Sequence, residues 1–239
     1  MPKIVFEKRA VAFIDILGFK SLVENADSVN LSFLEELVET LETAVPGLDG
    51  EVNPSMPREL IPKHISISDS IILSAPLTSA KMKSYCGLSV LVMRAIQLTH
   101  IFLEKGYLIR GGISVGPVWH TDSNIVGPAY QNAYLIETKT GAPRIELDPN
   151  AKEYWLQRND ASNSMCLNYR QRLMVNGLHD YYIQDGTDGA AEKVFKCYEA
   201  TIEHKITNEV VDSVQYKWWW FGEYLKSEIE RNKFIVHTK

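Results

Sequence analysis

The sequence predicts an α+β fold, in which a largely antiparallel sheet carries helices on one face. Two stretches rich in β-forming residues, 10–19 and 64–73, each hold an aspartate beside an apolar run. The expected elements follow the order β-α-β-α-β-α-β up to about residue 147. The chain lacks the Gly-rich fingerprint of a doubly wound nucleotide-binding fold. Hairpin-type strands therefore favour an α+β sandwich.

The first stretch reads Ala10-Val-Ala-Phe-Ile-Asp-Ile-Leu-Gly-Phe19. The apolar run from Val11 to Ile14 is long enough for one buried strand, and Asp15 interrupts it at its end. Gly18 permits a tight turn. A carboxylate at the end of a buried strand must be paired, hydrogen-bonded or metal-bound.

The second stretch, from His64 to Leu73, predicts another strand, with Asp69 between two apolar halves. If the two strands pair as a hairpin-like unit, Asp15 and Asp69 face each other. Two close carboxylates repel unless a divalent cation lies between them. One such aspartate is more often a turn or cap residue, but two in this setting favour a metal site.

Apolar residues at helical spacing predict the helices. Pro128 suits a first helical turn, and Gly106 is a stop signal for the helix before it. The expected helices follow Phe19, span Ala80–Lys105, begin near Gly127 and span Ala190–Val210.

A third strand is expected over Tyr107–Trp119, and it contains Arg110. Buried arginine is rare without an anionic partner, which here is either a local carboxylate such as Asp15 or a polyphosphate. Gly111 and Gly112 let another backbone or a ligand approach closely. A further short strand is expected over Arg144–Leu147.

Beyond Asp148 the pattern weakens. We expect residues 1–150 to form the catalytic domain and residues 151–239 to form an α/β extension packed on it. Within residues 211–226 lies an aromatic cluster that indicates internal packing or a subunit interface; it comprises Tyr216, Trp218, Trp219, Trp220, Phe221 and Tyr224.

Composition excludes several classes of protein. The 239 residues are 45% hydrophobic with a net charge of −5, which provides a core but no basic patch for nucleic acid. Cys86, Cys166 and Cys197 have no close spacing, which indicates a reducing compartment. The sequence shows neither a signal peptide nor a membrane span, so a soluble, cytoplasmic protein is expected.

The segment Phe13-Ile-Asp-Ile-Leu-Gly-Phe19, followed by Ser68-Asp69-Ser70, resembles the catalytic domain of class III nucleotide cyclases, which has a ferredoxin-like sheet. The strand Arg110-Gly-Gly-Ile-Ser-Val-Gly116 resembles the family's triphosphate-binding strand. Gly127, Ala133 and Glu137 match a helical motif that follows it, and Thr140–Leu147 matches the next stretch. The resemblance covers about Ala10 to Leu147.

This resemblance implies roles for individual residues. Asp15, Asp69 and the Ile16 carbonyl correspond to the ligands of two Mn²⁺ or Mg²⁺ ions. Arg110 corresponds to the triphosphate-binding arginine, and the turn before the helix corresponds to a phosphate-binding segment. The nucleotide-binding positions that the resemblance implies are Phe13, Leu17, Gly18, Phe19, Ile65, Arg110 and Asn124.

The departures from the family pattern concern the transition state and the base. Gln131, beside Asn132, stands at the transition-state asparagine, and Leu135 stands at the transition-state arginine, for which Arg144 is a candidate substitute. Ile65 and Asn124 occupy the base-reading positions, so the adenine and guanine readouts are both absent. An apolar residue with an amide suits a smaller base, as in the Pycsar pyrimidine cyclases of bacterial anti-phage defence, which this chain resembles.

The resemblance therefore implies a metal-dependent uridylate cyclase that makes cyclic UMP from UTP for a separate effector protein. By the same resemblance it is a homodimer with composite sites, since Asn124 and Gln131 of one chain would face Asp15 and Arg110 of the other. The alternatives are a cytidylate cyclase, a degenerate nucleotide-binding or dimerisation module and, less favoured, a diguanylate cyclase, whose acidic pair is missing after Gly112.

Overall fold

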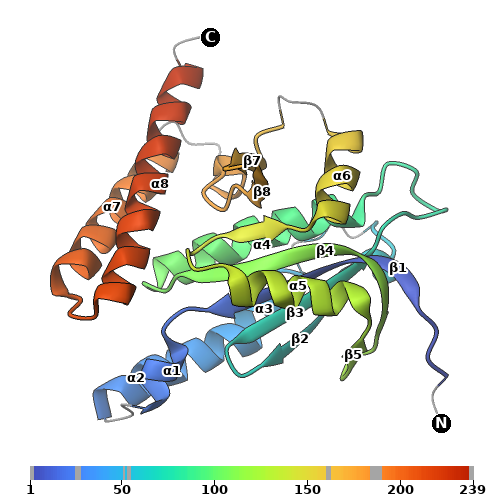
Figure 1. Ribbon diagram of the computed structural model, residues 1–239, viewed down its shortest axis with the longest axis horizontal. Coiled ribbons are helices and arrows are strands. Elements are labelled where there is room, and N and C mark those ends of the chain that lie inside the picture. The colour runs from blue at the N-terminus through green and yellow to red at the C-terminus, as the bar shows by residue number, and fades with distance from the viewer. Residues whose placement is uncertain are drawn as a thin grey trace.

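An eight-stranded sheet lies at the centre of the computed structural model, which describes residues 3–24, 28–50, 52, 55–159, 163–183 and 190–236. The strand order is β2-β3-β1-β4-β6-β8-β7, with β5 paired to β4 (Figure 1). All pairs are antiparallel except β4 with β6. The strands are β1 (Glu7–Ile16), β2 (Lys63–Ile67), β3 (Ser70–Pro76), β4 (Ile109–His120), β5 (Ile125–Val126), β6 (Ile145–Leu147), β7 (Cys166–Tyr169) and β8 (Arg172–Val175). The α+β class is confirmed.

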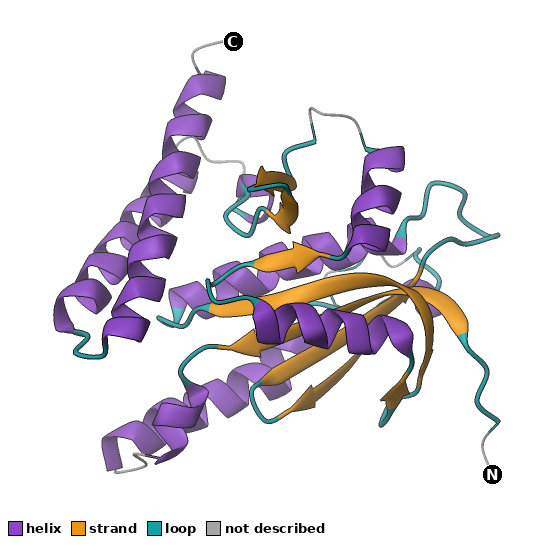
Figure 2. Cartoon of the chain, viewed as in Figure 1, coloured by secondary structure: helices purple, strands orange, loops and turns teal. Residues whose placement is uncertain are grey.

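Helices cover both faces of the sheet, which corrects the expectation of helices on one face (Figure 2). Alternate side chains of β1, such as Ala12 and Ile14, join the core beneath α4 (Gly87–Glu104). The residues between them, Val11 and Phe13, pack on the other side against α5 (Pro128–Lys139). A strand that is apolar at every position needs cover on both faces, and this explains the uninterrupted apolar run.

The stretch predicted as one strand is a hairpin. β2 and β3 pair antiparallel with Ile67 opposite Ser70, so Ser68 and Asp69 form the turn. Ser68 adopts a φ of 57°, a left-handed conformation that non-glycine residues rarely take. The turn could not be located from the sequence, because neither of its residues is a glycine.

The remaining helices surround this core. They are α1 (Phe19–Glu24), α2 (Ser28–Glu39), α3 (Val45–Gly47), α6 (Pro149–Arg158), α7 (Ala190–Asn208) and α8 (Asp212–Val236), with a π-helical turn at Thr40–Ala44 and short 3₁₀ turns at Arg58–Leu60 and Asp180–Tyr182. Helix α5 begins at Pro128, as expected, with Gly127 as its cap.

Helix α4 begins at Gly87 rather than at Ala80. The preceding segment is held by tertiary contacts, since Tyr85 is buried and its hydroxyl donates to the Leu60 carbonyl at 2.8 Å. Among the described residues, α4 alone has the length and hydropathy of a membrane span, but 67% of that helix is buried inside the fold. Its environment is that of a core helix.

The sheet continues past residue 150, because β8 pairs with β6 and β7 pairs with β8. Helices α7 and α8 then form a second core against this end of the molecule. Within the aromatic cluster, Tyr216 and Trp219 are exposed, whereas the others pack inside the chain: Trp218, Trp220, Phe221 and Tyr224. Internal packing therefore accounts for most of that cluster.

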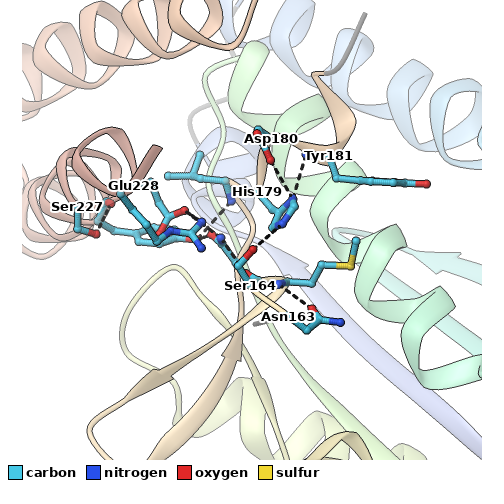
Figure 3. Close-up of polar contacts among 12 residues, drawn as sticks. Asn163, Ser164, His179, Asp180, Tyr181, Ser227 and Glu228 are labelled. Carbon is cyan, nitrogen blue, oxygen red and sulfur yellow. Dashed lines mark hydrogen bonds and ion pairs between the residues drawn. The ribbon is translucent and has the colours of Figure 1, made fainter. Parts of the chain in front are cut away.

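A buried polar network fastens α8 to the loop after β8 (Figure 3). Glu228 is almost fully buried, accepts from the Asn176 side-chain amide at 2.9 Å and pairs with Arg231. The Tyr224 hydroxyl donates to the Asn176 side-chain oxygen at 2.5 Å. These contacts satisfy the charge of Glu228, which would otherwise be costly to bury.

Candidate active site

Asp15 lies at the carboxyl end of β1, between two neighbouring strands. Its register partners are Ser70 on β3 and Arg110 on β4. The backbone N–H of Ile16 donates to the Asp69 carbonyl at 3.1 Å, which joins the β2–β3 turn to the end of β1. The structure thus places Asp69 beside Asp15, as the strand pairing predicts.

The two carboxylates affect each other electrostatically. The pKa of Asp15 is raised from 3.8 to about 7, first because the group is buried, then because Asp69 and Glu137 repel its charge. Arg110 acts in the opposite sense. A positive charge beside Asp15 favours its ionised form, and burial and the two neighbouring carboxylates disfavour it.

Arg110 has three partners at the start of β4. Its Nη2 donates to Oδ2 of Asp15 at 3.3 Å, and its Nη1 contacts the Thr140 carbonyl at 3.5 Å. Its Nε lies 2.6 Å from Oε1 of Glu137, but the N–H bond is not directed at that oxygen, so this contact is an ion pair without a hydrogen bond. Glu137 is buried in α5, and Arg110 neutralises it there.

The two glycines after Arg110 allow close approach of backbone. A Cβ at Gly111 would lie 2.4 Å from the Phe13 carbonyl oxygen, and a Cβ at Gly112 would lie 2.4 Å from that of Ala133. Gly111 therefore brings β1 close to β4, and Gly112 brings α5 close. Of the two expected alternatives, backbone or ligand, the close neighbour is backbone.

The Leu17–Phe19 turn only partly matches its expected phosphate-binding role. Gly18 adopts a φ of 93°, which favours glycine, and α1 starts directly after it. The Leu17 N–H already donates to the Leu108 carbonyl at 2.8 Å and is not available to a phosphate. Phe19 packs against the main core.

Of the other predicted positions, Phe13 precedes Asp15 by two residues on β1 and shares its face of the strand, whereas Asn124 lies apart from Asp15. Phe13 is buried beneath Tyr130 and Tyr134 of α5. Asn124 lies in the turn after β4, where its N–H donates to the Thr121 hydroxyl at 3.1 Å. Asn124 and Arg110 therefore lie toward opposite ends of β4, a strand of 12 residues with a length of about 36 Å at ~3.3 Å per residue.

Two further predicted residues also lie away from the carboxylates. Ile65 is half-buried in β2 opposite Ile72, and Gln131 is exposed on α5. One chain therefore brings together the residues predicted to bind metal and phosphate, whereas the predicted base and transition-state positions lie elsewhere. Leu135, at the missing transition-state arginine, is also exposed.

Arg144, the candidate substitute for that arginine, has a structural role. Its guanidinium pairs with Glu146 at 2.6 Å and lies 5.0 Å and 5.6 Å from the ring centroids of Tyr169 and Trp220. These contacts hold Arg144 between β6 and α8.

Sequence reasoning missed Lys217, which α8 brings to the same end of the sheet. Its pKa is lowered by burial and by the charge of Arg110, while Asp15 partly offsets this effect. No local motif marks this lysine, because its proximity arises only from the packing of α8.

A second polar cluster, Ser164, His179 and Asp180, has the residue types of a hydrolase triad (Figure 3). Nε2 of His179 lies 3.0 Å from the Ser164 hydroxyl. However, the Tyr181 N–H donates to Nδ1 of His179 at 3.0 Å, so in the neutral ring the proton is on Nε2. That tautomer cannot accept the serine proton, and His179 acts as a helix cap.

Two cavities of about 920 and 590 Å³ lie at the other end of the sheet, near Lys63 and His120. Neither is lined by Asp15, Asp69 or Arg110.

Comparison with solved structures gives the fold a known counterpart. The monomeric guanylyl cyclase domain of the RhoGC fusion protein from the aquatic fungus Blastocladiella emersonii matches with a TM-score of 0.50 and 16% identity, over 72% of this chain and 96% of that one. The fold is that of a class III nucleotide cyclase catalytic domain.

Other cyclases match at similar levels. The adenylyl cyclase CyaB from P. aeruginosa gives a TM-score of 0.49 and 13% identity, covering 72% of this chain and 93% of that one. The guanylate cyclase domain of RhGC from Catenaria anguillulae, in complex with GTP, gives 0.46 and 16%, covering 70% and 93%. No protein-family model matches the sequence, and no curated protein matches it. At these identities the likeness to cyclases concerns the fold.

Proposed function

We propose that the chain is a metal-dependent nucleotide cyclase that converts UTP to 3′,5′-cyclic UMP and pyrophosphate. The observation that carries the proposal is the position of Asp15 beside Asp69, with Arg110 paired to Asp15, on a cyclase catalytic fold. The family resemblance assigns Asp15 and Asp69 to metal binding and Arg110 to triphosphate binding, which supports the proposal.

The donor set suits two Mn²⁺ or Mg²⁺ ions. Asp15, Asp69 and the Ile16 carbonyl offer only oxygen, which hard divalent cations prefer. A bound divalent cation would offset the burial and the like charges that raise the pKa of Asp15. Among the described residues, no group of three or more His, Cys, Asp or Glu side chains is arranged to hold a metal ion. In the proposed site, substrate phosphate and water would supply further ligands, as is usual for Mg²⁺.

In the proposed reaction the ribose 3′-oxygen loses its proton and bonds to the α-phosphorus, while the bond from that phosphorus to the β-phosphate bridging oxygen breaks. Bound divalent ions would stabilise negative charge on the attacking and leaving oxygens. The protein's task is to position the triphosphate and stabilise its charge.

Arg110 is held ready for this task. Glu137 fixes its Nε, and Thr140 contacts its Nη1. When Asp15 serves as a metal ligand, its contact with Nη2 of Arg110 is released, and the guanidinium gains a free donor for phosphate. Glu137 therefore acts as a positioning residue.

The preference for a pyrimidine rests on Ile65 and Asn124. In the class III cyclases that this chain resembles, charged residues at these positions recognise the purine base. Here they are replaced by the apolar Ile65 and the amide of Asn124, and an asparagine amide can pair with uracil or cytosine. The cytidylate cyclase remains the alternative for this reason.

A homodimer would bring the separated positions together. Asn124 and Gln131 lie away from Asp15 within one chain. Helix α5 also exposes Tyr134 and Leu135, at 45% and 46%, beside Gln131. Exposed apolar residues next to the predicted partner-facing position support a subunit interface.

In the cell we propose a cytoplasmic enzyme of anti-phage defence, whose cyclic nucleotide is read by a separate effector protein. This proposal rests on the resemblance to Pycsar cyclases in residues 13–19 and 68–70 and on the departures at Ile65 and Asn124.

One assay tests the proposed activity. Purified protein with Mn²⁺ receives each of the four ribonucleoside triphosphates in turn, and chromatography resolves the products; the Asp69→Asn variant is the control. Cyclic UMP supports the proposal, and cyclic CMP supports the alternative base. Nucleotide binding without turnover would favour a degenerate binding module, and neither binding nor turnover would overturn the proposal.

A further inference from the structure

Helix α8 packs against the end of the sheet that holds Arg110 (Figure 1). Phe221 of α8 lines a small internal cavity together with Ile109 and Arg144, the latter of which lies in the loop before β6. Leu17, which follows β1, packs against the same aromatic core as Phe221. The extension therefore adjoins the proposed triphosphate end of the site.

Lys217 lies on this inward side of α8. It precedes Trp220 by three positions and Phe221 by four, and residues at these spacings share one helix face. Trp220 contacts Tyr169 through its indole N–H at 3.3 Å and lies beside Arg144. Lys217 is thus one helical turn farther along the face that contacts the sheet.

Lys217 makes no direct side-chain contact with an anionic group among the described residues. It is half-buried, and it forms no ion pair or hydrogen bond with any described residue. Other lysines of the extension are paired, as Lys226 is with Glu223 at 2.8 Å and Lys196 is with Glu192 at 2.7 Å. Burial without a counter-ion is costly for an ammonium group.

The nearby charges define what would satisfy Lys217. Burial lowers the pKa of Lys217 most, the charge of Arg110 lowers it further, and the charge of Asp15 acts in the opposite sense. If Asp15 ligates a metal, it no longer balances the charge of its neighbours. The cationic side chains of Arg110 and Lys217 then lie near each other, and Lys217 has no carboxylate of the protein as its partner. A chain of phosphates is the ligand whose charge and length suit two neighbouring cations.

We propose that Lys217 is a further triphosphate-binding residue, which acts with Arg110 of the same chain to hold the β- and γ-phosphates. This inference rests on the proposed nucleotide cyclase function. It also gives α8 a direct function, because the helix carries a binding residue into the site.

Inorganic tripolyphosphate with Mn²⁺ is the appropriate probe, since its binding does not depend on the base. Calorimetry should show that Lys217→Met weakens tripolyphosphate and UTP binding about tenfold or more, the usual effect of a lost charge-assisted contact. UMP binding should change little, and Lys217→Arg should retain most of the affinity. Lys226→Met, on the same helix but exposed and paired with Glu223, is the matched control.

The outcomes separate this inference from the proposed function. Wild-type turnover with unchanged tripolyphosphate affinity in Lys217→Met would overturn the role of Lys217 alone. A wild-type protein that neither binds tripolyphosphate nor cyclises any triphosphate would overturn both. Lys217→Gln, which keeps a polar side chain, and the melting temperature of each variant guard against a folding defect; equal loss for UMP and UTP would also contradict phosphate binding.

Discussion

Asp15 and Arg110 are direct partners across the β1–β4 pair, and Arg110 also reaches the buried Glu137 of α5. The arginine thus links a strand end that carries a carboxylate pair to a helix that carries a buried charge. Substitution of Arg110 should affect both the stability of the fold and the binding of phosphate.

The first prediction separates these two effects. Arg110→Ala leaves Glu137 buried without a counter-charge and should lower the free energy of unfolding by about 1–3 kcal/mol. The double variant Arg110→Ala/Glu137→Gln should recover most of that stability in urea unfolding. Neither variant should bind tripolyphosphate well, whereas nucleoside binding should change much less. Equal loss of nucleoside and triphosphate binding would point to a purely structural arginine.

The second prediction concerns pH. The pKa of Asp15 in the folded protein is raised to about 7 from a usual 3.8, so its ionisation disfavours the metal-free fold. The stability that the protonated group provides is complete below about pH 4 and is lost as the pH rises through about 7. The melting temperature of Asp15→Asn, relative to wild type in chelator, should therefore rise between pH 5 and pH 8.

Two comparisons check that result. Asp122→Asn, at an exposed site, should show no such trend. Added Mn²⁺ should stabilise the wild type most above pH 7, where Asp15 is ionised, and should have little effect on Asp15→Asn. A constant difference between variant and wild type across the whole pH range would contradict the raised pKa.

The third prediction concerns the carboxylates themselves. Asp15→Ala or Asp69→Ala should abolish turnover with the fold intact, because each removes a proposed metal ligand without creating a large cavity. Circular dichroism tests the fold, and product chromatography with Mn²⁺ tests turnover. Near-wild-type activity in either variant would remove the two-metal interpretation.

Local pattern was sufficient for the central elements. The sequence predicts strands at the apolar runs of β1 and β4, and the structure has them there. It also predicts helices close to the observed bounds of α4, α5 and α7. The pairing of β1 with β3 also brings Asp69 beside Asp15, as the two similar stretches predict. These features depend on periodicity, which neighbouring residues determine.

Features that depend on tertiary packing were not predictable in this way. The turn at Ser68 has no glycine to mark it, and the pairing of Arg110 with Glu137 depends on how α5 crosses β4. The position of Lys217 depends on how α8 returns to the sheet. The aromatic cluster indicated either internal packing or a subunit interface, and the burial of Trp218 and Trp220 inside the chain favours internal packing.

The last prediction tests the composite site directly. If Asp69 of one chain works with Gln131 of another, mixing Asp69→Ala with Gln131→Ala should restore activity that neither variant has alone. Random exchange makes half of the dimers mixed, and each mixed dimer has one intact site of two, so the mixture should reach at most about a quarter of wild-type activity. Asn132→Ala replaces Gln131→Ala as partner if the glutamine variant remains active. A monomer at assay concentration, still fully active, would overturn both the dimer and the shared site.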